Sequence, residues 1–390
     1  MPRASLLSET TAPAPGGVRR LDALTGLRFY AALLVFAFHL SLNRFFAGDA
    51  PAVEPLRFIL KNGGWFGVTF FFVLSGFVLA WSARAGDTPG RFIWRRIAKI
   101  VPNHAVTFFA ALAIGGLGAA STGEAIANFF LLQAWIPADT AFFSINHPSW
   151  SLSAELFFYL AFPFAFPLVK RVPRQRLLAV GAGLVLLVTA APLVAAMLPY
   201  GAEFGANHLQ SPLHGASIPQ IWAVYALPPA RFIEFALGML AARAVLEGLI
   251  PRIPLGPAAV FAAAGYALSL FVPLAWQMDS AYVLPVAVLV IAAAQEPAPP
   301  RILASPAAVR LGELSFAFYM VHDIILTATR AILGPDPLQP LPAAGVIVAS
   351  FVVSLAAAWL LWRLIETPAN NALRTLNPFG TTRRSTTREA

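Results

Sequence analysis

Residues 28–43 read RFYAALLVFAFHLSLN, a stretch apolar enough to cross a bilayer as a helix. It nevertheless carries Arg28 at its start, His39 eleven residues later and Asn43 one turn further on. Eleven helical steps come to three turns and about 20°, so Arg28 and His39 share one face and lie about 16 Å apart. Ionisable groups in a membrane helix favour a protein interior or a wet cavity. Two simpler roles stay open: His39 as a hydrogen-bonding contact between helices, and Arg28 as a flanking surface charge.

The composition extends this expectation to the whole chain. Of its 390 residues, 58% are hydrophobic and only 12% are charged, whereas soluble domains average roughly 25% charged residues. We therefore predict an all-α protein, a polytopic transmembrane helix bundle. The chain has no cysteine, which excludes disulfides and thiolate sites, and we expect no metal site. The net charge of +9 comes from bases between apolar segments, which indicates membrane orientation and no nucleic-acid partner.

Apolar segments of roughly membrane-spanning length recur along the chain. We predict about ten spans, the sixth of them broken by Pro228–Pro229, at residues 28–46, 65–82, 104–120, 150–169, 177–198, 222–242, 255–273, 281–295, 312–334 and 342–364. Most of the 27 lysines and arginines lie in the terminal segments and the even-numbered loops, so both termini are predicted to be cytoplasmic. We expect disordered polar tails at residues 1–20 and 375–390 around one membrane domain, residues 21–374. Residues 1–20 also lack the pattern of a signal peptide.

Two predicted spans carry polar groups at helical spacing. In the fourth span, Ser151, Glu155 and Tyr159 recur every four residues and so form one stripe. A carboxylate at that depth needs a partner or a proton, which makes Glu155 a candidate site residue, with a structural ion pair to an arginine as the alternative. In the sixth span, Arg231 and Glu234 lie three residues apart, and we predict an internal neutralising pair.

Two further stretches allow a structural and a functional interpretation. In the ninth span, Ser315, Tyr319 and His322 share one face next to Asp323, either as a polar seam between helices or as part of a site. The basic residues 91–102 read RFIWRRIAKIVP. They fit an interfacial helix on anionic lipid, and they equally fit a clamp for phosphate, which arginine binds through two parallel hydrogen bonds.

Five stretches match, in order, the motifs of one known family. They are LDALTGLR at 21–28 with His39, against LDGLRG and a later histidine; GVTFFFVLSGF at 67–77, against GVDLFFVLSGF; RRIAKIVP at 95–102, against RRxxRIxP; WSLSAE at 150–155, against WSLxxE; and SFAFYMVH at 315–322, against SYxxYxxH. The sequence thereby resembles the acyltransferase-3 family of integral-membrane acyltransferases from Leu21 to about Arg374. Thr69 stands where that family has an acid, and Lys99 where it has a third arginine.

The resemblance implies a multi-pass O-acyltransferase of the bacterial plasma membrane. Such an enzyme takes an acyl group from acyl-coenzyme A, a co-substrate, and binds no permanent cofactor. It implies that Arg28 and His39 are catalytic, and that Arg95, Arg96 and Lys99 lie near the phosphates of the coenzyme. The other candidate substrate-binding residues are Ser151, Tyr159, Tyr319 and His322.

The residue types fit this chemistry. An imidazole has an ordinary pKa of about 6.5 and accepts a proton from a hydroxyl group at neutral pH, so we expect His39 to be the base. Glu155 is expected to orient that ring and stabilise its charged form, as the acid of a catalytic triad does. Direct transfer and an acyl-histidine intermediate both stay open.

The acceptor is inferred from resemblance alone. The LTGLRF start at residues 24–29 and the compact length look most like actinobacterial members that acylate macrolide antibiotics. We therefore expect a short acyl group, acetyl or propionyl, to reach a hydroxyl of a glycosylated secondary metabolite such as a macrolide. The alternative acceptor is an envelope polysaccharide. A transporter of a lipid-linked sugar or metabolite is the alternative of another class, and it predicts broken, repeat-related helices.

Overall fold

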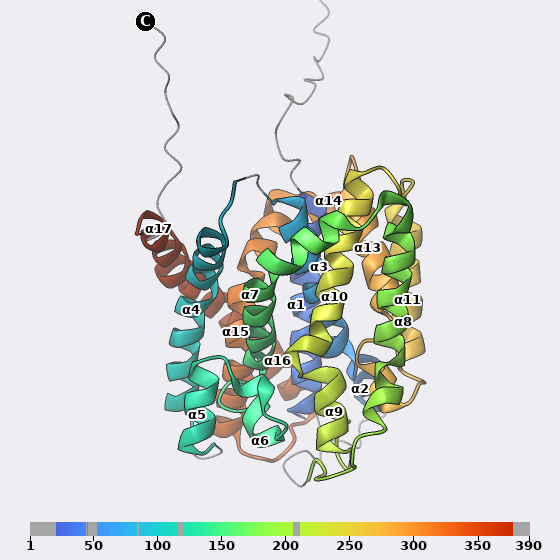
Figure 1. Ribbon diagram of the computed structural model, residues 1–390. Helices are drawn as coiled ribbons and strands as arrows, with labels where there is room; N and C mark the ends of the chain where they lie inside the picture. The colour runs from blue at the N-terminus through green and yellow to red at the C-terminus, as the bar shows by residue number, and fades with distance from the viewer. Residues whose placement is uncertain are drawn as a thin grey trace, which may run out of the picture.

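The computed structural model describes residues 21–43, 45, 53–83, 86–115, 120–205 and 211–376, and the secondary-structure elements in these ranges are helices joined by turns and loops (Figure 1). The helices are α1 (Asp22–Leu42), α2 (Val53–Leu60), α3 (Gly63–Trp81), α4 (Pro89–Ala113), α5 (Thr122–Phe129), α6 (Asp139–Phe142), α7 (Trp150–Arg171), α8 (Leu177–Ala195), α9 (Ile218–Tyr225), α10 (Pro228–Leu246), α11 (Leu255–Ser269), α12 (Leu274–Gln277), α13 (Val283–Gln295), α14 (Arg301–Ala304), α15 (Pro306–Leu333), α16 (Pro340–Leu361) and α17 (Thr367–Thr375). The described residues contain no β-strand. The predicted all-α class is thus confirmed.

Each of the ten predicted spans overlaps a helix, although the third and the sixth have other boundaries, and the helices are α1, α3, α4, α7, α8, α10, α11, α13, α15 and α16. Within the described residues, six segments are long and apolar enough to cross a membrane: Asp22–Leu42, Val53–Trp81, His147–Arg171, Arg174–Ala195, Pro306–Leu333 and Pro340–Leu373. α11 and α13 are shorter apolar helices, while α4 and α10 are long helices that carry charged residues. The chain is a multi-pass membrane protein, as predicted.

α3 is the central helix of the bundle. In an apolar stretch of 18 residues within the segment that contains α3, 83% is buried inside the protein. The corresponding values are 17% for the segment of α8 and 22% for that of α16. α3 packs against α1, α10 and α13, and α15 packs against α1 and α16. α8 and α16 instead present exposed apolar side chains such as Leu186 and Val348. These two helices therefore form lipid-facing edges, where their backbone groups are satisfied within the helix.

Two glycines allow α3 and α10 to touch. A Cβ atom on Gly76 would lie 1.9 Å from the carbonyl oxygen of Phe235, and one on Gly238 would lie 2.0 Å from that of Val73. Small residues permit such backbone contacts between membrane helices. The contact fixes the position of α10 against the central helix, and with it the buried charges that α10 carries.

The predicted pair of Arg231 and Glu234 is confirmed and is part of a larger ion cluster. Their side chains lie 3.0 Å apart and are fully buried, and Asp279 is 2.8 Å from the same guanidinium. Thr69 donates a hydrogen bond to Glu234 (2.9 Å) and accepts one from Arg231 (3.2 Å). Thr69 thus stands in a cluster where two carboxylates already face one cation. The guanidinium also lies over the ring of Tyr225, 5.9 Å from its centroid.

One predicted boundary is wrong and another is confirmed. The basic residues 91–102 and the third span, expected as separate elements, form the single helix α4, because Pro102 lies inside this helix without ending it. The sixth predicted span is divided into α9 and α10, as Pro228–Pro229 indicated. A proline is favourable at the first position of a helix, where its missing N–H is not needed.

The short helices mark the two ends of the bundle (Figure 1). α14 and α17 lie at one end, called here the α17 end, while α5, α6 and α9 lie at the opposite α5 end. α1 starts at the α17 end, since Gly26 packs against Leu303 of α14. Both ends of the described chain therefore lie on one side. The tails predicted at 1–20 and 375–390 fall outside the described residues, except for Thr375 and Leu376.

Candidate active site

Two pockets follow α1 and meet at Val68 and Tyr319, which line both of them. The first pocket is a cavity of about 140 Å³ and the second one of about 310 Å³. Arg28 lines the first pocket and His39 lines the second. The two side chains that share one face of α1 thus serve different cavities.

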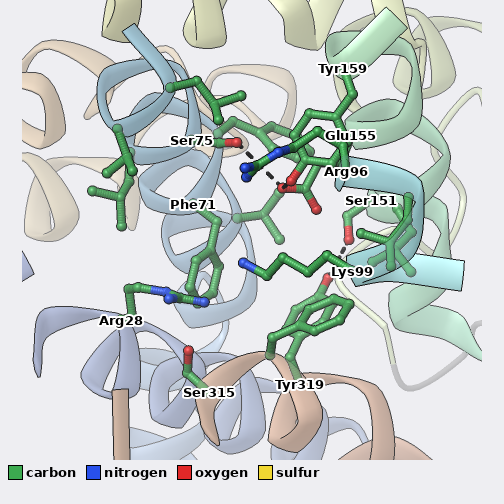
Figure 2. A pocket seen from close by; sticks show the side chains of 18 residues that line it. Arg28, Phe71, Ser75, Arg96, Lys99, Ser151, Glu155, Tyr159, Ser315 and Tyr319 are labelled. Carbon is green, nitrogen blue, oxygen red and sulfur yellow. Dashed lines mark hydrogen bonds between the residues drawn. The ribbon is translucent and has the colours of Figure 1, made fainter. Parts of the chain in front are cut away.

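The first pocket is basic. Arg28 of α1 and Arg96 and Lys99 of α4 line it together with one carboxylate, Glu155 of α7 (Figure 2). Neither Arg28 nor Lys99 has a hydrogen bond or an ion pair within the described part of the chain, and both are half-buried. Partly desolvated cations without partners are unfavourable. The pocket is therefore suited to an anionic ligand.

The polar stripe predicted on α7 does face this pocket, since Ser151, Glu155 and Tyr159 all line it. Glu155 accepts a hydrogen bond from the Tyr159 hydroxyl and one from Ser75 of α3, the latter at 3.4 Å. The Ser151 hydroxyl lies 2.9 Å from that of Tyr319 on α15. The stripe thus connects α3, α7 and α15 around the pocket, as Figure 2 shows.

α4 brings its bases to the pocket because it is anchored along its length. At its start, the Thr88 side chain accepts a hydrogen bond from the backbone N–H of Arg91 (3.4 Å), as an N-cap does. One turn beyond Lys99, Asn103 donates a hydrogen bond of 2.7 Å to the buried Glu366. Glu366 ends a π-helical turn between α16 and α17, a geometry common at functional sites.

Arg95 and Arg96 are neighbours in sequence but have different surroundings. Arg95 donates hydrogen bonds to both carboxylate oxygens of Asp87 and lines a third pocket, a cavity of about 730 Å³ where α3 and α7 end and α4 begins. Arg96 lines both the third and the first pocket, with its guanidinium 5.6 Å from the ring centroid of Phe92. Lys170 also lines the third pocket. Arg96 therefore connects two cavities, whereas Asp87 neutralises Arg95.

The second pocket has aromatic walls and a few polar groups. Trp65, Trp150 and Tyr225 line it, with ring centroids 4.4 Å apart between Trp150 and Tyr225. Its polar lining residues include Asn43, His147 and Asp323 beside His39. A mainly aromatic pocket with few convergent polar groups is typical of binding sites for small organic molecules.

A second histidine lies behind His39. Nδ1 of His39 is 3.1 Å from Nε2 of His322 and 3.0 Å from the carbonyl oxygen of Val35. His322 is fully buried, lines neither of the two pockets and contacts the expected base, while its predicted role in substrate binding stays a prediction. The next residue, Asp323, accepts a hydrogen bond of 2.9 Å from His147, whose side chain is 55% exposed.

The expected contact between Glu155 and His39 is not found. Glu155 faces the first pocket and bonds to Tyr159 and Ser75, whereas His39 lines the second pocket. Neither Asp323 nor His147 was predicted to line a site. Asp323 directly follows the SFAFYMVH motif, and His147 precedes WSLSAE. Their positions beside these motifs were the sequence signal that could have identified them as site residues.

Comparison with known proteins agrees with the motifs. A family model described as an acyltransferase domain, acyltransferase-3, matches residues 21–363. The chain belongs to this acyltransferase family. The acyltransferase is 35% identical to Acyltransferase MdmB of Streptomyces mycarofaciens, across 96% of this chain and 98% of MdmB.

Two further relatives are described by name as peptidoglycan O-acetyltransferases. OatA of Listeria monocytogenes is 26% identical and matches 89% of this chain but 55% of its own length. The putative enzyme YrhL of Bacillus subtilis is 30% identical across 37% of this chain and 23% of its own length. No solved structure matches the acyltransferase.

Proposed function

We propose that this acyltransferase moves a short acyl group, such as acetyl or propionyl, from acyl-CoA to a hydroxyl group of a glycosylated secondary metabolite, with a macrolide as the preferred acceptor. The proposal rests on one observation above all. A basic pocket, in which Arg28 and Lys99 have no partner among the described residues, meets at Tyr319 a second pocket that contains the imidazole of His39.

The basic cavities suit the donor. Acyl-CoA carries its negative charge on phosphates and ends in a long neutral arm with the thioester. The third pocket offers Arg96 and Lys170 for phosphate oxygens, which guanidinium groups bind well. Arg96 also lines the first pocket, where Lys99 and Arg28 offer further cations for phosphate oxygens, and the neutral arm extends beyond them. The thioester then lies close to Tyr319, where the pockets meet.

In the reaction, Nε2 of His39 takes the proton of the acceptor hydroxyl while its oxygen attacks the thioester carbonyl carbon. The new C–O bond forms, the C–S bond breaks, and the leaving sulfur receives the proton back from His39. The products are an ester and free coenzyme A. Arg28 lines the first pocket and not the pocket of His39, about 16 Å away along α1, so we assign it to binding of the donor and not to the base. Glu155 acts as a positioning residue, since it is the carboxylate that lines the pocket of the three cations.

The second pocket suits a ring-shaped polar acceptor. Trp65, Trp150 and Tyr225 offer flat surfaces for sugar or lactone rings, and Asn43 and His147 offer hydrogen bonds. The chain and MdmB cover almost all of each other, whereas OatA extends far beyond its match. The aromatic cavity of about 310 Å³ favours a small metabolite. A wall or envelope glycan is the second candidate, supported by the names of OatA and YrhL.

We place the α17 end of the bundle in the cytoplasm. Arg95, Arg96 and Lys170 line the pocket at the helix termini there, and cytoplasmic loops are the ones enriched in such residues. Acyl-CoA is made in the cytoplasm, so this orientation exposes the third pocket to the donor. Reactivity of single cysteines, introduced at Arg91 and at Thr140 of the otherwise cysteine-free chain, with an impermeant reagent in intact cells tests it. Labelling at Arg91 would contradict it.

The test of the activity is release of coenzyme A from acetyl-, propionyl- and isovaleryl-CoA by detergent-purified protein, with and without a sixteen-membered macrolide. Because the chain has no cysteine, a thiol reagent reports coenzyme A without background from the enzyme. His39→Ala is compared with His104→Gln, a control histidine that is buried and bound to the backbone oxygens of Asn128 and Phe129.

We expect release of coenzyme A that requires both the macrolide and His39. The His104→Gln control should retain this release. Release that needs His39 without any macrolide would move the acceptor to glycans and contradict the macrolide assignment. Full release by His39→Ala would exclude His39 as the base. No release from any donor with any acceptor would contradict the use of acyl-CoA and favour the transporter alternative.

A further inference from the structure

We propose that His322 is a positioning residue that, together with the Val35 carbonyl group, holds the proton on Nδ1 of His39, so that Nε2 of His39 is the bare nitrogen available to the acceptor hydroxyl. This inference rests on the proposed function, in which His39 is the base. It replaces the triad acid expected at Glu155 by a second imidazole. His322 is fully buried beside His39 on α15, stacked on Phe318 at 5.9 Å between ring centroids.

Two backbone carbonyl groups fix the direction of the hydrogen bonds. A carbonyl oxygen only accepts, so the nitrogen that faces it carries the proton. Nδ1 of His39 lies 3.0 Å from the Val35 oxygen, and Nδ1 of His322 lies 3.2 Å from the Phe318 oxygen. Both Nδ1 atoms therefore carry hydrogen. A neutral imidazole has a single N–H, so the remaining nitrogen of each ring is bare.

The contact between the two rings agrees with this assignment. Nε2 of His322 is 3.1 Å from Nδ1 of His39, which is a hydrogen bond only when one nitrogen donates and the other accepts. Since Nδ1 of His39 carries the proton, it donates to Nε2 of His322 and to Val35 in a three-centre bond. Nε2 of His39 has no hydrogen-bond partner among the described residues, and His39 lines the second pocket.

The arrangement also favours the charged state that His39 passes through. When Nε2 takes the proton of the acceptor, the ring becomes a cation and its Nδ1–H becomes a stronger donor. Hydrogen bonds to charged groups are the stronger class, and an imidazole nitrogen is a better proton acceptor than a carbonyl oxygen. Asp323, which is 5% exposed, supplies a nearby negative charge, and His147 on the rim binds that carboxylate.

The resting tautomer is measured directly by nitrogen magnetic resonance of protein labelled with ¹⁵N in its six histidines, at a pH of about 8 where free imidazole is neutral. The signals of His39 are those that disappear in His39→Ala. Couplings of each nitrogen to the ring protons distinguish Nδ1 from Nε2. We expect Nδ1 of His39 to be protonated and Nε2 to be bare. A proton on Nε2 would overturn the inference, whatever the enzyme's activity.

The catalytic consequence is measured with His322→Leu and His322→Gln. Loss of one hydrogen bond to a charged group predicts a fall in kcat of about 10- to 100-fold for His322→Leu, with KM for acyl-CoA nearly unchanged. Glutamine keeps an acceptor oxygen near the position of Nε2, so we expect a clearly smaller loss. His104→Gln, a buried histidine outside both pockets, is the matched control and should retain activity.

Different results would contradict the proposed function and the role of His322. Full activity of His39→Ala would remove the proposed base and with it the proposed function. Loss of activity in His39→Ala with unchanged kcat in His322→Leu would leave the proposed function intact and overturn the role of His322. Equal losses in His322→Leu, His322→Gln and His104→Gln would indicate general damage to the bundle and contradict a positioning role as well.

Discussion

Arg231→Met should destabilise the bundle more than any other single change in its buried ion cluster. The guanidinium is fully buried, 3.0 Å from Glu234 and 2.8 Å from Asp279. Methionine leaves both carboxylates without their cation. Removing one partner of a buried ion pair costs about 3–5 kcal/mol, and one cation serves two carboxylates here, so we expect the upper part of that range. Thr69→Val removes only hydrogen bonds and should cost about 1–3 kcal/mol.

A double substitution tests this charge balance most sharply, through the direction in which it changes the stability of Arg231→Met. Adding Glu234→Gln to Arg231→Met removes one of the stranded charges, while the amide oxygen still accepts the hydrogen bond of Thr69. The double variant should therefore be more stable than Arg231→Met alone, by about 1–3 kcal/mol, although Glu234→Gln destabilises the wild type. Unfolding in detergent can be followed by the fluorescence of the nine tryptophans. A double variant less stable than Arg231→Met would refute the charge-balance explanation.

Four further substitutions test the packing and the donor pockets. Gly76→Ala should separate α3 from α10, because its Cβ would lie 1.9 Å from the Phe235 oxygen, and we expect a lower melting temperature in the same fluorescence assay; an unchanged value would contradict the contact. Lys99→Met should raise KM for acyl-CoA about tenfold with little change in kcat, measured by coenzyme A release, and an unchanged KM would contradict its role. Arg96→Gln should raise the same KM about tenfold and Arg95→Gln by less than about threefold, since Asp87 already neutralises Arg95; the reverse order would contradict the assignment.

The helices of this fold could be predicted from local sequence, because the apolar length and the polar face of a helix depend on its own residues. Apolar stretches indicated a helix at each of the ten predicted spans, and helical spacing placed Ser151, Glu155 and Tyr159 on the face that lines the first pocket. Their partners are set by contacts between distant segments. His39 meets His322, 283 residues further along the chain, and no spacing rule relates those positions. The partner of His39 was therefore misassigned to Glu155, a carboxylate of a motif on another predicted span.

Arg95 and Arg96 show the same limit within one motif. Local sequence treats the two arginines alike, and both were predicted beside the phosphates of the coenzyme. In the helix they point about 100° apart, so Arg95 meets the Asp87 carboxylate and Arg96 faces two cavities. A cation already held by a carboxylate gains less from a phosphate than one that lines the path to the thioester. The donor path of the proposed reaction therefore depends on Arg96 and Lys99, and Arg95 contributes mainly by holding the start of α4 to the preceding loop.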